Sequence, residues 1–200
     1  SQCDVDFYSQ TRNLDNSSEL VGILKKKSQS QISKLMSLSE KLSKLNFDRF
    51  QKFKLPFNRN NAKQAILAFK GDVYNGIDAP ALTTDDLNFA QDSVRMLSGL
   101  YGVIRPLDLI QPYRLEMGTK LSNSKGKDLY EYWGTEISDV LNEDESELIV
   151  NLSSNEYFKA VDKKTLNANV LDIVFKEKKG EVYKVIGIYA KRARGLMVNY

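Results

Sequence analysis

The stretch MLSGLYGVIRPLDLIQPYRLEMGTK, residues 96–120, is punctuated by glycines and prolines that helix or strand periodicity does not explain. Gly99 and Gly102 permit tight backbone geometry, and Pro106 and Pro112 fix the backbone angle φ. The same stretch carries three cations that could contact a negatively charged ligand, namely Arg105, Arg114 and Lys120. Such a segment favours recognition of an anion over simple core packing.

The first half of this stretch predicts a helix-hairpin-helix-like element. Thr83 and Asp86 have the spacing of a capping box, and the helix that they open is predicted to run to Gly99. Residues 100–104 then partly match the hairpin, and Pro106 opens a second short helix. Backbone N–H groups of such a hairpin point at phosphate oxygens, so the element predicts phosphate binding.

The match to the hairpin is incomplete. Tyr101 stands where the usual motif has proline, and Ile104 stands where it has a second glycine. A simpler interpretation is equally compatible with the spacing, in which Gly99 ends one helix and Pro106 begins the next. Both interpretations stay open from the sequence.

The segment before residue 60 is predicted to be helical. One helix opens at Ser17 or Ser18 and ends at Lys27, where cations suit a helix C-terminus. A longer helix follows, with one apolar stripe at spacings of three and four, formed by Ile32, Leu35, Leu38, Leu42 and Leu45. The lysines off this stripe are interpreted as solubilising and are left out of the site, namely Lys34, Lys41 and Lys44.

In the second half of the chain, the spacing of the apolar residues changes from a helical pattern towards a strand pattern. Asp128 opens a helix, and residues 147–152 and 169–176 are predicted strands. A turn at 178–180 leads into a returning strand over 181–189. The sequence therefore predicts a mixed α/β (α+β) fold, with a central bent sheet and surrounding helices.

Composition limits the class of protein. With 42% hydrophobic and 28% charged residues over residues 1–200, and no linker, we expect one globular domain. No apolar stretch is long enough to span a bilayer, and the N-terminus lacks the features of a signal peptide. We expect a cytoplasmic monomer without membrane contact.

The chain contains no histidine and one cysteine, Cys3. Ser-His-Asp and Cys-His catalysis are therefore excluded, and so are the usual zinc and iron ligand sets. A lone cysteine forms no internal disulfide and no CxxC motif. The sequence predicts no cofactor and no metal.

Cations are concentrated near the C-terminus, where three occur within four residues before Gly195. A second cationic loop lies at 120–127, and no aromatic side chains interleave it as a base-stacking platform would require. The net charge of +3 permits binding of a polyanion, and arginine matches phosphate geometry well. We predict binding to the DNA backbone through Lys70, Gly99, Gly102, Arg105, Arg114, Lys120, Lys125, Lys127, Lys191, Arg192 and Arg194.

An enzyme is the alternative. Asp72 and Tyr74, in a loop predicted at 70–76, could join Glu116 and Glu156 in one pocket. With a lysine of depressed pKa, Lys70 or Lys191, such groups could act on a nucleobase, a nucleotide or a DNA lesion. Pairing of Glu116 with a neighbouring arginine and loop closure by Tyr74 are the more common roles of such residues, and we favour a binding protein over an enzyme.

Several segments together resemble the YaaA family of peroxide-stress proteins (UPF0246 type). They are AILAFKGDVYNG, the central block MLSGLYGVIRPLDLIQPYRLEMGTKL, GKDLYEYWG, VNLSSNEYFKAV and YAKRARGLM. The resemblance implies a bacterial protein that limits iron-mediated oxidative DNA damage during hydrogen peroxide stress. It also implies a helix-hairpin-helix and a positively charged cleft for duplex or branched DNA.

Two features of that family have no counterpart in this sequence. Members usually begin with a strand that leads into an SPAK-like loop, and residues 1–9 show no such pattern. The tail that follows the ARGLM segment is also missing. We therefore expect a single YaaA-like domain that lacks its N-terminal strand and its C-terminal tail.

Overall fold

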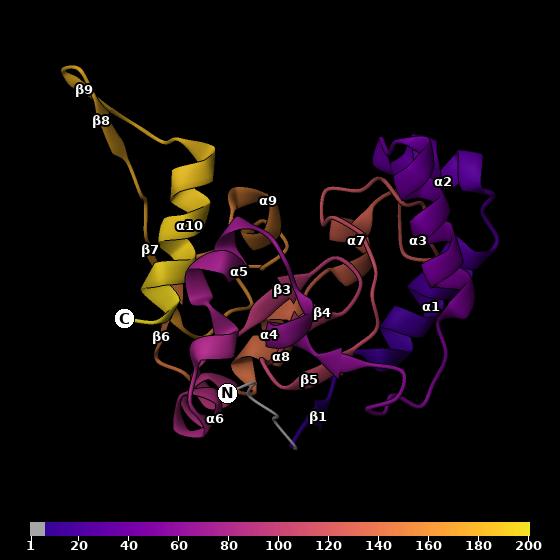
Figure 1. Ribbon diagram of the computed structural model, residues 1–200, viewed down its shortest axis with the longest axis horizontal. Helices are drawn as coiled ribbons and strands as arrows, with labels where there is room; N and C mark the ends of the chain where they lie inside the picture. The colour runs from indigo at the N-terminus through magenta and orange to yellow at the C-terminus, as the bar shows by residue number, and fades with distance from the viewer. Residues whose placement is uncertain (1–6) are drawn as a thin grey trace.

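The computed structural model describes residues 7–200, so Cys3 lies outside the described part of the chain. Helices and short strands occur together along the whole described chain, which confirms the predicted mixed α/β class (Figure 1). No helix of residues 7–200 has the length and apolar character needed to cross a bilayer. The helices are α1 (Leu14–Lys25), α2 (Gln29–Met36), α3 (Glu40–Lys52), α4 (Ala65–Ala68), α5 (Asp72–Ile77), the 3-10 helix η1 (Ala79–Ala81), α6 (Thr84–Ser93), α7 (Leu129–Trp133), α8 (Glu136–Asn142), α9 (Asn155–Phe158) and α10 (Gly187–Val198).

The strands are short and form four small sheets within the described residues, in place of the predicted central bent sheet. In the largest, β5 lies between β1, which is parallel to it, and β2, which is antiparallel. The other sheets pair β3 with β4, β6 with β7 and β8 with β9. The strands are β1 (Ser9–Gln10), β2 (Lys63–Gln64), β3 (Met96–Ser98), β4 (Gly102–Ile104), β5 (Asp108–Ile110), β6 (Leu148–Asn151), β7 (Asn169–Asp172), β8 (Glu177–Lys179) and β9 (Val182–Lys184).

The stretch 96–120 runs through the centre of the fold, and the prediction of a helix-hairpin-helix there is wrong. Helix α6 ends at Ser93, and the chain then forms the β3–β4 hairpin and β5. Val94 is extended, with φ −102° and ψ 136°. The physical reason is burial, because most side chains of this apolar stretch lie in the core, including Leu100, Tyr101, Ile104, Leu109 and Met117, each 0% exposed.

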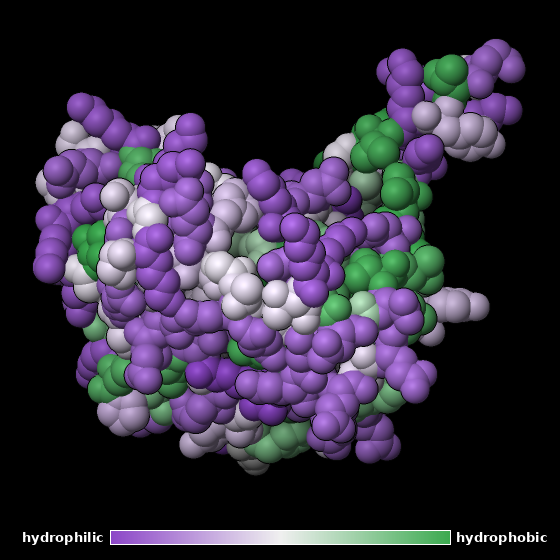
Figure 2. Space-filling view, turned by 180° about the vertical axis from the view of Figure 1, so that it is seen from behind, coloured by the Kyte–Doolittle hydropathy of each residue, from purple (hydrophilic) through white to green (hydrophobic). Residues whose placement is uncertain are grey.

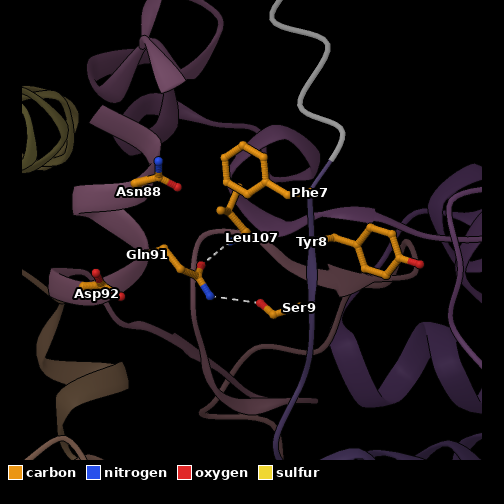
Figure 3. A pocket seen from close by; sticks show the side chains of 7 residues that line it. All are labelled: Phe7, Tyr8, Ser9, Asn88, Gln91, Asp92 and Leu107. Atoms are coloured by element: carbon orange, nitrogen blue, oxygen red, sulfur yellow. Dashed lines mark hydrogen bonds between the residues drawn. The ribbon is translucent and has the colours of Figure 1, made fainter. Parts of the chain in front are cut away.

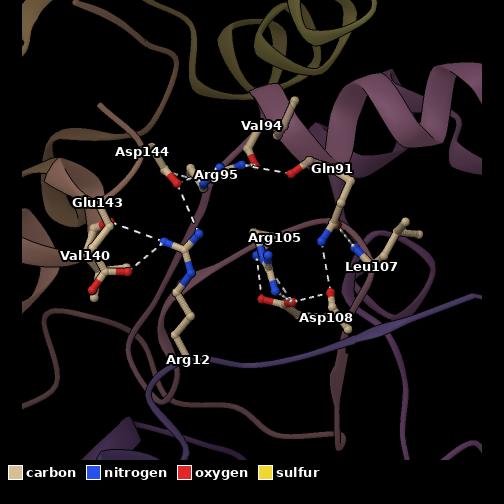
Figure 4. Close-up of polar contacts among 11 residues, drawn as sticks. Arg12, Gln91, Val94, Arg95, Arg105, Leu107, Asp108, Val140, Glu143 and Asp144 are labelled. Atoms are coloured by element: carbon tan, nitrogen blue, oxygen red, sulfur yellow. Dashed lines mark hydrogen bonds and ion pairs between the residues drawn. The ribbon is translucent and has the colours of Figure 1, made fainter. Parts of the chain in front are cut away.

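Arg95 fixes the point where α6 ends. Its Nη1 donates to the carbonyl oxygens of Gln91 and Val94, at 3.0 and 2.9 Å, so it satisfies two carbonyl groups of the last turn. Its other nitrogens form a two-pronged ion pair with Asp144, at 2.6 and 2.8 Å (Figure 4). Arg12 donates to the same carboxylate at 3.1 Å. This cluster ties the N-terminal segment and α6 to the end of α8.

The Asp144 carboxylate predicts a pH dependence. Burial alone would raise its pKa, but the hydrogen bonds and charges of Arg95 and Arg12 outweigh burial and lower it. A lowered pKa stabilises the fold above the unfolded value of about 3.9, and this stabilisation is lost as the pH falls through the folded value. We expect Asp144→Asn to lower the free energy of unfolding by about 2 kcal/mol at pH 7, and by less below about pH 4.

Urea unfolding at several pH values measures this loss. Glu143→Gln is the matched control, because Glu143 lies 3.4 Å from Arg12 but its side chain is 62% exposed. Its effect should stay below about 1 kcal/mol. A loss for Asp144→Asn that does not shrink in acid would contradict the assignment.

Other predicted elements differ from the observed ones in specific ways. The long helix predicted over residues 32–45 is broken into α2 and α3, because Ser37 adopts a left-handed conformation, with φ 51°. Ser39 then caps α3 by accepting a hydrogen bond from the N–H of Leu42. The loop predicted at 70–76 is largely α5, and the returning strand is β9 followed by the start of α10. The capping box of Thr83 and Asp86 is confirmed.

Candidate nucleic-acid interface

Four of the predicted DNA-binding cations are already paired with carboxylates of the chain. The pairs are Arg105–Asp108 (3.1 Å), Arg114–Glu116 (2.8 Å), Lys127–Glu131 (3.1 Å) and Lys125–Glu136. A phosphate that approached one of these cations would compete with its carboxylate. Their contribution to binding is therefore smaller than that of a free cation.

Four other predicted cations are exposed and form no ion pair with any described residue. They are Lys70, Lys120, Lys191 and Arg192. Because no internal carboxylate has to be displaced, they can neutralise phosphates at the lowest free-energy cost. They form the strongest part of the candidate interface.

Two of these free cations, Lys191 and Arg192, lie on α10, which packs against α5 (Figure 1). Gly76 and Gly195 face each other, and a Cβ added to Gly195 would lie 2.8 Å from the Cα of Gly76. Asn199 Nδ2 donates to the carbonyl oxygen of Ile77 at 2.8 Å. Lys70 lies two residues before the start of α5, so close glycine packing places the α5 segment beside the helix that carries the other two.

The surface of α10 is not uniformly cationic. Ile188, Tyr189 and Leu196 are 54–59% exposed on the same helix. Figure 2 shows apolar side chains along the side of the molecule that carries α10 and the projecting β8–β9 hairpin. Cations and apolar groups are therefore mixed on this surface.

Arg194 differs from Lys191 and Arg192. Its side chain is half-buried, and its Nε is buried without a hydrogen-bond partner among the described residues. An arginine in this position is held by the packing of the helix. Removal of the Arg194 side chain would therefore change packing as well as charge.

Gly99 and Gly102 lie in the core, where they permit close packing. A Cβ on Gly99 would lie 2.4 Å from the carbonyl oxygen of Leu115, and one on Gly102 would lie 2.9 Å from the Trp133 ring. Gly102 also has a φ of 68°, which favours glycine. Trp133 Nε1 donates to the Gly99 carbonyl oxygen at 3.1 Å. Close packing against the Leu115 backbone accounts for Gly99, and close packing against the Trp133 ring accounts for Gly102, without a bound phosphate.

Three of the four residues of the enzyme alternative come together around Tyr157. Burial, followed by the charges of Glu156 and Glu116, raises the pKa of Tyr157 to about 12. Burial and the neighbouring Tyr157 also raise the pKa of Tyr74. No described contact joins Asp72 to this group. Tyrosine hydroxyl groups are protonated at neutral pH even at their ordinary pKa, and the raised pKa values keep these two protonated further into the alkaline range.

Both carboxylates of this group already have partners within the protein. Glu116 pairs with Arg114, and Glu156 Oε1 accepts a hydrogen bond from the N–H of Gly118 at 2.9 Å. The described cavities, of about 320 and 420 Å³, lie elsewhere. Among the described residues, no cluster of three or more acidic, cysteine or histidine side chains could hold a metal ion.

Two residues that organise the stretch 96–120 were not predicted from the sequence. Tyr113 lies beside Tyr101, with ring centroids 5.1 Å apart, and its hydroxyl lies 2.5 Å from Ser98 Oγ. Asp108 is 0% exposed and holds Arg105. The signal for Asp108 was present, because a carboxylate inside an apolar run needs a partner, and Arg105 is three residues away.

Comparison with known proteins agrees with the resemblance found in the sequence. The family model described as "Peroxide stress protein YaaA" matches residues 2–200. A UPF0246 protein of Acaryochloris marina is 60% identical over 183 residues, which cover 90% of this chain and 73% of the relative. UPF0246 proteins of Albidiferax ferrireducens and Idiomarina loihiensis are 57% and 55% identical, over 94% and 96% of this chain and 74% and 76% of the relatives. The chain belongs to the YaaA family of peroxide stress proteins.

Proposed function

We propose that this chain is a cytoplasmic DNA-binding protein of the response to hydrogen peroxide. It would protect duplex or branched DNA against iron-mediated oxidative damage by binding that is largely independent of sequence. The family supports the connection with peroxide stress. The observation that carries the DNA-binding part is the set of exposed, unpaired cations at α5 and α10, Lys70, Lys191 and Arg192.

These cations would act by neutralising phosphates and releasing counterions from the DNA. The logarithm of the binding constant then falls linearly with the logarithm of the salt concentration, by about 0.9 for each neutralised phosphate of duplex DNA. Contacts of this kind position a protein without reading the bases. Low sequence preference and steep salt dependence are therefore the expected signature.

The test is a salt series of duplex binding, with wild type beside a Lys191→Ala/Arg192→Ala double variant. We expect the slope to fall by about two units in the variant, because two phosphate contacts are lost. Both side chains are exposed and unpaired, so the fold should be unaffected. Fluorescence anisotropy of a labelled duplex measures the affinity at each salt concentration.

The matched control is Lys34→Ala/Lys41→Ala, which removes the same charge from exposed positions on α2 and α3. These helices lie on the opposite side of the molecule from α10 (Figure 1). The control should keep the wild-type slope. Equal slopes for all three proteins would remove α10 from the interface, and a lack of binding at low salt would reject DNA binding.

The convergence of Tyr74, Glu116 and Glu156 around Tyr157 favours a second candidate, an enzyme acting on a nucleobase, a nucleotide or a DNA lesion. Its test is incubation of the protein with oligonucleotides that contain oxidised or deaminated bases, followed by chromatography of the products. Product formation that is lost in Glu156→Gln would support the enzyme. No product from any substrate would leave DNA binding as the function.

A further inference from the structure

A cavity of about 320 Å³ lies apart from the α5–α10 surface, where the N-terminal segment passes α6. Its walls come from Phe7 and Tyr8, from Asn88, Gln91 and Asp92 of α6, and from Leu107 (Figure 3). The volume is at the lower end of the range for small-molecule sites, about 300 to 1,000 Å³. The cavity can therefore hold a small group.

One wall of this cavity is fixed by hydrogen bonds. Gln91 Oε1 accepts from the N–H of Leu107 at 2.8 Å, and its Nε2 donates to Ser9 Oγ at 2.9 Å. Ser9 Oγ donates in turn to Asp108 at 2.5 Å. Both ends of the Gln91 amide are occupied, so Gln91 holds the shape of the wall and is not the group that would bind a ligand.

Asn88 and Asp92 are different. They are four residues apart on α6 and therefore share one face of the helix. Both side chains are exposed, and neither makes a hydrogen bond or ion pair with any residue from 7 to 200. Figure 3 shows the Asn88 amide directed toward the Phe7 ring, whereas the Tyr8 ring lies on the other side of the strand. The cavity thus presents a carboxylate, an amide and an aromatic ring that is 38% exposed.

The charge of this region selects among ligands. Asp92 is the one formally charged side chain among the described residues of the lining, and α6 also carries Asp85 and Asp86 in its first turn. A phosphate would be repelled here, so this cavity is not an extension of the proposed DNA interface. A positively charged group would be attracted.

Among cations, the guanidinium group has the closest chemical match to each of these three side chains. It is planar, so it can stack on the Phe7 ring, and its N–H groups can form two parallel hydrogen bonds with the Asp92 carboxylate. A remaining N–H can donate to the Asn88 amide oxygen. An ammonium group is more strongly hydrated and lacks the planar face.

We propose that this cavity binds a guanidinium group, supplied either by a small molecule or by an arginine side chain of a partner protein. The site is independent of the proposed DNA-binding function. Asp92 supplies the charge, Asn88 a second acceptor and Phe7 the stacking surface. Gln91 and its bonds to Leu107 and Ser9 keep the wall in place.

The test is a titration of the isotope-labelled protein with agmatine and with putrescine, followed by the NMR signals of the Asn88 and Gln91 side-chain amides. The two probes share a four-carbon chain and an amine, and differ in guanidinium against ammonium. We expect saturable shifts with agmatine, and an affinity about fivefold or more above that for putrescine. Asp92→Asn should weaken agmatine binding about tenfold.

Two further variants make the test specific. Asp85→Asn removes the same charge from α6 outside the cavity and should change the affinity less than about twofold. Phe7→Leu keeps an apolar side chain but removes the ring, and should weaken agmatine binding about fivefold. No saturable shift, equal affinity for both probes, or unchanged binding in Asp92→Asn would overturn the proposal.

A further arm of the same experiment identifies the source of the guanidinium group. A blocked tripeptide Ala-Arg-Ala is titrated beside agmatine, with Ala-Lys-Ala as its control. Tighter binding of the arginine peptide assigns the site to a partner protein, and tighter binding of agmatine assigns it to a small molecule. Failure of all four probes would reject the site and leave the DNA-binding proposal unaffected.

Discussion

Asp108→Ala should lower the free energy of unfolding by about 3 kcal/mol. The side chain of Asp108 is 0% exposed, and its carboxylate accepts hydrogen bonds from the Arg105 N–H, the Arg105 guanidinium and Ser9 Oγ (Figure 4). Alanine removes every acceptor and leaves the arginine charge without its partner. The loss is placed at the low end for a broken buried pair, because the Arg105 side chain keeps 27% exposure. Urea unfolding followed by circular dichroism measures the change.

Asp85→Ala is the control for this substitution. Asp85 is exposed in the first turn of α6, so its removal loses only a favourable interaction with the helix dipole, of less than about 1 kcal/mol. Equal losses in the two variants would mean that the Asp108 carboxylate does not hold Arg105 and Ser9 together. Asp108→Asn should lie between them, since the amide keeps one acceptor oxygen.

The features that the sequence analysis predicted correctly depend on neighbours in the chain. The capping box of Thr83 and Asp86 uses residues three apart, and a turn at Gly180 is confirmed, with φ 65°. The strand predicted at 147–152 corresponds to β6, at Leu148–Asn151. For the capping box and the turn, the local sequence contains the groups that stabilise the structure, whereas β6 also needs its pairing with β7.

The hairpin at 96–104 shows what local reasoning lacks. Gly99 and Pro106 satisfied the rules for a helix end and a helix start, but both glycines of this segment are placed by Trp133 and Leu115, which lie further along the chain. Strand pairing of β3 with β4 and burial under the Trp133 ring then decide the conformation. The β3–β4 pairing lies within the segment, but the contact with Trp133 cannot be read from the segment itself.

The contacts of the candidate site are likewise of two kinds, those that neighbours in the sequence predict and those that only the fold brings about. The partner of Arg105 lies three residues away, at Asp108, and could have been inferred from the sequence. The pairing of Lys125 with Glu136 requires α8 to fold back on the preceding loop. The meeting of Tyr74 with Tyr157 requires the final arrangement of α5 and α9. Charge counting therefore identified the cations but could not tell which of them remain free.

The substitution Gly195→Ala should cause the second large loss of stability, because it disturbs the contact between α5 and α10. A Cβ at this position would lie 1.9 Å from the carbonyl oxygen of Val73 and 2.8 Å from the Cα of Gly76, and backbone atoms cannot move aside cheaply. We expect the helices to separate, with a loss of about 3 kcal/mol in the free energy of unfolding measured in urea. The displaced α10 would also carry Lys191 away from α5 and weaken duplex binding.

Gly187→Ala is the matched control, because it changes the same residue type on the same helix. Nothing lies within 4 Å of a Cβ at Gly187, so alanine there should leave stability unchanged or raise it by up to about 1 kcal/mol through helix propensity. Both variants replace glycine by alanine in α10, and the propensity gain is smaller at the first residue, Gly187, than at Gly195, so the difference between them is a lower limit on the cost of separating α10 from α5. If Gly195→Ala also gained stability, close packing of these helices would not be required, and the joined cationic surface would lose its structural basis.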